Sequence, residues 1–119
     1  MKIKRGDIFF ADLSPVLGSE VGGMRYVVVI HKNELNDDAS SNGGTVIVAP
    51  LSSNNAEVKN RNATETMLVD IPKLSVFSYK ILLYEIRSID TKRLKNHIGR
   101  LSDETMAELD KKLKYALGL

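Results

Sequence analysis

The residues best suited to chemistry lie in and beside one polar loop near the start of the chain. This loop, residues 14–23, contains hydroxyl groups, a carboxylate and two adjacent glycines, and Arg25 follows it. A guanidinium carries a rigid fork of donors that matches the oxygens of a phosphate. Arg25, held at the start of a strand beside a glycine-rich polar loop, therefore predicts an anion site. The alternative is an arginine that pairs with a carboxylate at a strand edge.

Two further side chains could act with Arg25. Glu20 belongs to the same loop and could orient the arginine or accept a proton; the alternative is a solvated loop glutamate. Ser52 follows a β-branched run, and its hydroxyl could donate a hydrogen bond to a phosphate oxygen. The alternative is a turn serine, because Ser53 and Asn54 come directly after it.

Short strands must position these groups. Runs rich in Val, Ile and aromatic residues, bounded by Gly, Asn and Pro, predict strands. We expect them near residues 7–12, 25–31, 45–50, 66–71 and 80–86. Several short strands separated by turn signals favour a compact barrel or sandwich.

Helical signals are clearest at the C-terminus. Ser102 is suited to cap a helix, and Asp103 and Glu104 suit its positive first turn. An apolar stripe recurs at helical spacing and comprises Met106, Leu109, Leu113, Ala116 and Leu117. We therefore predict one amphipathic C-terminal helix.

The remaining segments give weaker signals. A short helical turn is expected to start at Asp90, with Leu94 and Ile98 facing inward. Residues 33–44 and 54–66 are polar and rich in Gly, Asn, Ser and Asp, so we predict loops there.

Composition limits the classes of function. The chain has 119 residues, which predicts a single domain over 1–119 with one modest core. It has no Cys and only two His, which excludes disulfides and Cys-based zinc sites; we expect no metal and no cofactor. The sequence contains no apolar run long enough to predict a membrane span or a signal peptide, and we therefore expect the protein in the cytoplasm. The net charge of +2 is compatible with nucleic acid without arguing for it.

The two histidines, His31 and His97, raise the hypothesis of a paired-histidine ribonuclease. One ends a predicted strand and the other lies in a polar, lysine-rich segment. We therefore do not predict that they act together.

Three parts of the chain resemble, in order, the MazF/PemK family of toxin endoribonucleases from bacterial toxin–antitoxin pairs. The first comprises Lys4-Arg5-Gly6-Asp7-Ile8, Ala11-Asp12-Leu13-Ser14-Pro15, Gly18-Ser19-Glu20, Gly22-Gly23 and Arg25. The others are Val48-Ala49-Pro50-Leu51-Ser52-Ser53, and Ile86-Arg87-Ser88-Ile89-Asp90 with Lys92-Arg93-Leu94. The resemblance spans nearly the whole chain and is loose at 33–44 and 54–76.

The resemblance implies a mainly β fold with helices (α+β), a small, twisted antiparallel β-barrel with a C-terminal helix packed outside it. It implies a metal-independent endoribonuclease that cleaves single-stranded RNA sequence-selectively, by attack of the 2′-hydroxyl to give a 2′,3′-cyclic phosphate. The catalytic residues it implies are Arg25, Ser52 and, as the weakly preferred base, Glu20. The substrate-binding residues are Ser19, Gly22, Gly23, Tyr26, Ser53, Asn54, Tyr84 and Glu85.

The resemblance also implies a homodimer and a cognate antitoxin with a disordered acidic tail that folds into the RNA groove. Two other functions stay open: a non-enzymatic protein poison like the CcdB gyrase inhibitors, which share this fold, and an RNA-binding module with a decayed site.

The chain departs from the family pattern at three places. Tyr26 replaces a frequent Pro, and its ring could stack on a base. Ser52 replaces Thr and keeps the hydroxyl without the methyl that restrains χ1. Tyr84 and Glu85 replace an acid followed by Gln, and in a strand that shift moves the charge to the opposite face. We expect altered base selection from it. Arg87 and Asp90 are expected to form a structural ion pair and a cap.

Overall fold

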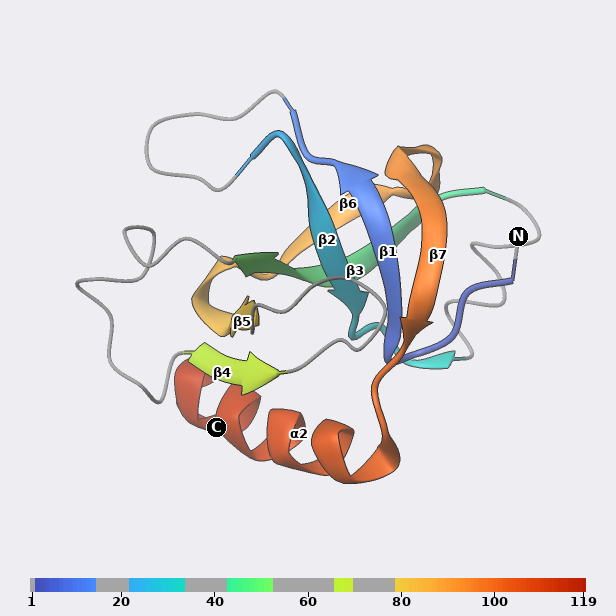
Figure 1. Ribbon diagram of the computed structural model, residues 1–119. Coiled ribbons are helices and arrows are strands. Elements are labelled where there is room, and N and C mark those ends of the chain that lie inside the picture. Colours follow the sequence, from blue (N-terminus) through green and yellow to red (C-terminus); the bar gives the residue numbers. More distant parts are fainter. Residues whose placement is uncertain (1, 15–21, 34–42, 53–65, 70–78) are drawn as a thin grey trace.

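The computed structural model describes residues 2–14, 22–33, 43–52, 66–69 and 79–119, and Figure 1 shows an antiparallel sheet packed against a C-terminal helix. The strands are β1 (Asp7–Asp12), β2 (Met24–Val29), β3 (Thr45–Ser52), β4 (Thr66–Val69), β5 (Tyr79–Leu82), β6 (Arg87–Asp90) and β7 (Leu94–Arg100). The helical elements among the described residues are α2 (Asp103–Leu117) and the 3-10 turns η3 (Leu83–Glu85) and η4 (Thr91–Arg93).

The sheet runs in the order β4-β5-β3-β2-β1-β7, and β6 also pairs with β3. All of these pairs are antiparallel. The predicted α+β class is confirmed, but the predicted barrel is not closed, because no ladder among the described strands joins β7 to β4 or β6. β3 holds the sheet together, since it pairs with β2, β5 and β6 along different parts of its length.

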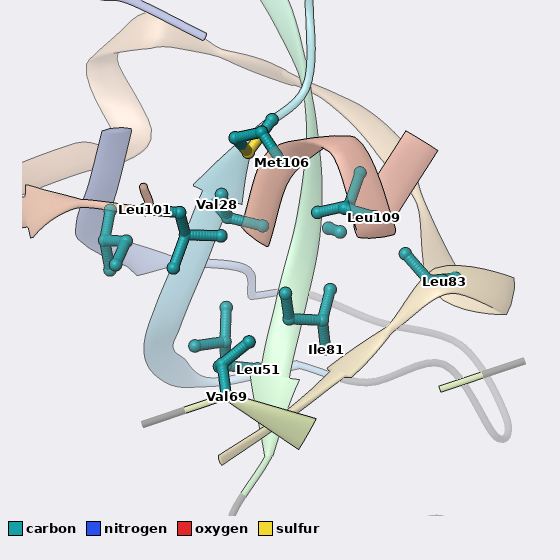
Figure 2. Packing of buried hydrophobic residues seen from close by; sticks show 10 residues of the cluster. Val28, Leu51, Val69, Ile81, Leu83, Leu101, Met106 and Leu109 are labelled. Atoms are coloured by element: carbon teal, nitrogen blue, oxygen red, sulfur yellow. The ribbon is translucent and has the colours of Figure 1, made fainter. Parts of the chain in front are cut away.

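Both faces of the central strands are buried, which explains the unbroken apolar run of β2. Val28 belongs to a cluster that packs against α2, whereas Val27 and Val29 belong to a second cluster. Figure 2 shows the first cluster, in which Met106 and Leu109 of α2 face Val28 and Ile81 of the sheet. A strand that is buried on both faces has no solvent-exposed positions, so polar residues do not alternate with its apolar residues.

The C-terminal helix begins where its sequence predicts, and a glycine ends it. The Ser102 side chain accepts a hydrogen bond from the Thr105 backbone N–H at 3.1 Å, and Gly118 ends the helix in the left-handed conformation. Met106 and Leu109 are buried, but Leu117 is 50% exposed, so the apolar stripe stops before it. No helix in the described part of the chain is long and apolar enough to cross a membrane.

The turn of residues 4–7, at the start of β1, connects this strand to β7 and to α2. The buried carboxylate of Asp7 accepts hydrogen bonds from the Lys4 backbone N–H at 2.8 Å and from Arg100 Nε at 2.9 Å. Arg5 Nη2 lies 2.6 Å from Asp110 Oδ1 of α2. This family-like motif therefore has a structural role, because it fixes the turn to β7 and α2.

The strand predicted over 80–86 ends early, at Leu82. Leu82 and Leu83 are both fully buried, and consecutive residues of a strand point to opposite faces. The chain turns into η3, which places Leu83 in the cluster against α2 and leaves Leu82 with Tyr84. Tyr84 and Glu85 are therefore not in a strand, and the argument that the charge moved to the opposite sheet face is wrong.

The segment after Asp90 differs more. Its predicted helical turn is the single turn of η4, and strands β6 and β7 were not predicted. β7 is mostly exposed and polar, so it has little apolar alternation to reveal it. Its pairing with β1 is interrupted by register shifts, and Leu94 and Ile98 consequently pack in different clusters.

The other predicted strands are confirmed, with ends shifted by up to two residues in β2 and β3. β4 is found over Thr66–Val69, and residues 70–71 of its predicted range lie outside the described residues. Residues 34–42 and 54–65 of the predicted loops also lie outside them.

Candidate active site

Arg25 lies on β2, opposite Ala11 of β1, at the end where the polar loop returns to the sheet. Its side chain is half-buried. Because side chains alternate along a strand, Arg25 shares a face with Val27 and Val29, both fully buried. The arginine thus lies where an apolar face of the sheet ends, on a rigid element.

The guanidinium of Arg25 joins the loop to the end of β3. Nε donates to the carbonyl oxygen of Gly22 at 3.1 Å, and Nη1 donates to the carbonyl oxygen of Leu51 at 3.1 Å. These bonds fix the direction of the fork. Backbone carbonyl groups of the loop and of β3 thus hold the guanidinium.

Ser52 is the last residue of β3, and only 4% of it is exposed. In the ladder between β2 and β3, Val27 pairs with Pro50. Continued by two residues, this register places Arg25 level with Ser52, in agreement with the bond from Arg25 to Leu51. The two residues that the sequence singled out for phosphate chemistry are therefore neighbours in the fold.

The structure adds a residue that the sequence did not indicate. On the other side of β3, Lys80 of β5 is the Cα partner of Ser52. A half-buried lysine in a predicted strand carries no local signal of this pairing, which depends on two segments almost thirty residues apart in sequence.

The ends of the polar loop are held together at its base. The backbone N–H of Leu13 donates to the carbonyl oxygen of Gly23 at 2.9 Å. Gly23 has φ +76°, which favours glycine over other residues. Gly23, predicted to bind substrate, thus has a structural role in closing this base. Gly22, also predicted to bind substrate, accepts the hydrogen bond from Arg25 Nε.

Two further arginines bind the carbonyl groups at the start of the loop. Arg87 Nη1 donates to Leu13 at 3.5 Å; Arg93 Nη1 donates to Asp12 at 3.1 Å and to Ser14. Among the ion pairs of the described residues, none joins Arg87 to Asp90, so that prediction is wrong. The predicted cap is confirmed, because Asp90 Oδ1 accepts from the Lys92 backbone N–H at 2.8 Å.

The structure places Tyr26 on the sheet face opposite Arg25. Its ring centroid lies 5.1 Å from that of Phe10 and 5.7 Å from that of Tyr79. All three rings are half-buried. Tyr26 is thus part of an aromatic group beside the cluster that packs on α2.

The remaining predicted site residues are distributed as follows. Tyr84 and Glu85 are half-buried on η3, after the end of β5. Ser19, Glu20, Ser53 and Asn54 lie outside the described residues.

The two histidines have different partners. His31 Nδ1 accepts from the Ile47 backbone N–H at 3.1 Å, whereas His97 Nε2 lies 3.2 Å from Asp7 Oδ1. In the described part of the chain, no three His, Asp or Glu side chains are grouped so that they could hold a metal ion.

A family model and several solved structures match this chain. Residues 4–117 match the family model described as PemK-like, MazF-like toxin of type II toxin–antitoxin system. MazF from Deinococcus radiodurans superposes with a TM-score of 0.79 at 19% identity, over 100% of this chain and 99% of that one.

Two further solved structures were determined with a partner. A mycobacterial endoribonuclease in complex with its cognate antitoxin has a TM-score of 0.71 at 19% identity, covering 99% of this chain and 95% of that one. A MazE–MazF structure from Deinococcus radiodurans has a TM-score of 0.71 at 17% identity, covering 100% and 99%. At such identities these likenesses show a shared fold.

Proposed function

This chain belongs to the PemK-like, MazF-like toxin family of type II toxin–antitoxin systems, and from that premise we propose that it is a sequence-selective endoribonuclease acting on single-stranded RNA. The observation that carries the proposal is the fixed guanidinium of Arg25 at the end of β3, level with the Ser52 hydroxyl. A protein that only binds a partner has no need of this pair. Solved relatives described as endoribonucleases share the fold and support the proposal.

The reaction we propose uses the substrate's own nucleophile. The 2′-hydroxyl oxygen forms a bond to the adjacent phosphorus, and the bond from phosphorus to the 5′-oxygen breaks. The products are a 2′,3′-cyclic phosphate and a 5′-hydroxyl. A base takes the 2′-hydroxyl proton, and the leaving oxygen gains one.

Arg25 and Ser52 have distinct roles in this reaction. A guanidinium keeps its proton in proteins, so Arg25 stabilises the negative charge that develops on the phosphoryl oxygens. Ser52 adds a hydrogen bond. For the base we prefer Glu20, with Glu85 second. Of the substrate-binding residues that the sequence indicated, the proposal keeps Ser19, Gly22, Gly23, Ser53, Asn54, Tyr84 and Glu85. It does not keep Tyr26, because that ring packs on the sheet face opposite Arg25.

The proposal includes the assembly and the partners of the protein. We propose a single toxin domain over 1–119 that forms a two-fold homodimer, the commonest soluble assembly. Its cognate antitoxin has an acidic, disordered tail that occupies the RNA groove, and complexes of relatives with antitoxins support this partner. We propose that it cleaves its RNA substrate in the cytoplasm.

One experiment separates this function from the alternatives. The purified protein is incubated with a mixture of RNAs in EDTA, and the cut ends are mapped. We expect cuts at a short recurring sequence, confined to single strands, because only unpaired bases expose their edges to side chains. A CcdB-like poison or a decayed RNA-binding module would leave the RNA intact.

A substitution pair at Ser52 tests the hydroxyl. We expect Ser52→Ala to slow single-turnover cleavage by roughly tenfold or more, as for loss of a hydrogen bond to a charged group. Ser52→Thr should preserve or raise the rate, since it keeps the hydroxyl and restrains χ1. Thermal melting checks that both variants fold, which matters because Ser52 is buried. Equal rates for alanine and wild type would reduce Ser52 to a structural role.

A further inference from the structure

Lys80 lies beside the proposed catalytic pair without belonging to the family-like motifs. It is the second residue of β5 and the Cα partner of Ser52 in the antiparallel ladder between β3 and β5. Partners in such a ladder lie about 4.5–5.5 Å apart at their Cα atoms, and their side chains point to the same face. The four-carbon stem of a lysine can therefore carry its ammonium past the hydroxyl of Ser52.

The neighbouring pair confirms which face this is. Leu51 pairs with Ile81, and both belong to the cluster that packs on α2. Alternation along the two strands places Ser52 and Lys80 on the opposite face. Arg25 lies on this opposite face too, because its neighbour Tyr26 packs against the α2 cluster. Arg25, Ser52 and Lys80 thus form a row across β2, β3 and β5, with a cation on each side of the hydroxyl.

Lys80 has no partner that would use its charge within the described structure. No hydrogen bond or ion pair joins its ammonium to another described residue, and the side chain is half-buried. Arg5 and Arg100, by contrast, each bind a carboxylate. A half-buried ammonium beside a candidate phosphate site suits an anionic ligand, which supplies the missing counter-charge.

We propose that Lys80 is a further substrate-binding residue, whose ammonium binds a backbone phosphate of single-stranded RNA lying across Ser52. This inference rests on the proposed function and adds a second cation to its site. The row of three residues then contacts the RNA backbone on both sides of the Ser52 hydroxyl. A lysine acts here as a point charge, so it contributes affinity without reading the base.

The salt dependence of RNA binding tests this role. The probe is an RNA oligonucleotide that spans a mapped cleavage site and carries 2′-deoxyribose there, so that it binds uncut. Each phosphate contact contributes about 0.7 to the slope of the logarithm of the binding constant against the logarithm of salt concentration. We expect Lys80→Gln to reduce the magnitude of this slope by about 0.7 and to weaken binding about tenfold at low salt. Lys80→Arg should retain the wild-type slope.

Lys111→Gln is the matched control, because it removes the same charge from another surface. Lys111 is an exposed residue of α2, and α2 packs on the sheet face opposite the row of Arg25, Ser52 and Lys80. The slope of this variant should equal that of wild type. Circular dichroism verifies folding, and Lys80→Met replaces the glutamine variant if that one does not fold.

Each outcome decides between the two proposals. An unchanged slope in folded Lys80→Gln, or an equal loss in Lys111→Gln, overturns the role of Lys80 while RNA cleavage by wild type still upholds the proposed function. A wild-type protein that cuts no RNA overturns both.

Discussion

Replacing the 2′-hydroxyl at the cut site by hydrogen is expected to abolish cleavage while leaving RNA binding intact. The sequence has no Cys and only two His, and in its described part no three His, Asp or Glu side chains are grouped to hold a metal ion. We therefore predict a reaction that needs no catalytic divalent ion. The remaining nucleophile is the substrate's own 2′-hydroxyl, already close to the phosphorus. The measurement is single-turnover cleavage of matched ribose and 2′-deoxyribose oligonucleotides, with binding measured in parallel.

EDTA provides the complementary test. We expect the cleavage rate to change little in EDTA, and mass spectrometry to detect the 2′,3′-cyclic phosphate at early times. Loss of activity in EDTA that magnesium restores would contradict this mechanism, even if the protein proves to be a nuclease. Continued cutting of the 2′-deoxy substrate would do the same.

Arg25→Ala is expected to reduce single-turnover cleavage by roughly 10²-fold or more, the scale for losing one preorganised donor at a developing oxyanion. Its guanidinium is oriented by the carbonyl groups of Gly22 and Leu51, so little reorganisation is needed when charge develops. The two hydrogen bonds contribute about 1 kcal/mol each to stability. We therefore expect the variant to fold, with a modestly lower melting temperature.

Two companion variants separate charge from geometry. Arg25→Lys keeps the charge but loses the fork that binds both carbonyl groups, and we expect activity between those of wild type and Arg25→Ala. Lys111→Ala removes an exposed charge from α2, on the opposite face of the sheet, and should cleave like wild type. A folded Arg25→Ala within threefold of the wild-type rate would remove Arg25 from the mechanism.

The hydrogen-bond partners of Arg25 distinguish its role from the roles of the other two arginines at the loop base, Arg87 and Arg93. Arg87 and Arg93 donate to carbonyl groups of Asp12, Leu13 and Ser14, where the chain leaves β1. Arg25 alone of these three also bonds to the end of β3, beside Ser52. The proposed chemistry accordingly falls on Arg25, whereas Arg87 and Arg93 hold the loop base from the side of β6 and η4.

Several features of the fold could be read from the sequence because their causes are local. The β-branched run of β2 and the cap at Ser102 each act on residues within one turn or one strand. Arg25 and Ser52 were likewise identifiable, since their residue types and flanking strands match a family pattern. The identity of these groups and the elements that carry them were thus determined by the sequence itself.

Other features depended on contacts between distant segments. β7 is a polar strand that forms because it pairs with the edge of β1. β5 ends at Leu82 because the chain turns there, which lets Leu83 pack against α2. Neither cause is visible in the local pattern.

The arrangement of the site belongs to this second kind. Arg25, Ser52 and Lys80 come from three strands, and only the registers of β3 with β2 and β5 place them in one row. A shift by one residue would turn Ser52 to the other face of the sheet. The sequence by itself determined which groups could bind a phosphate and on which strands they lie. The tertiary structure decided which of them meet, because strand register is set by packing on both faces of the sheet and not by the residues of any one strand.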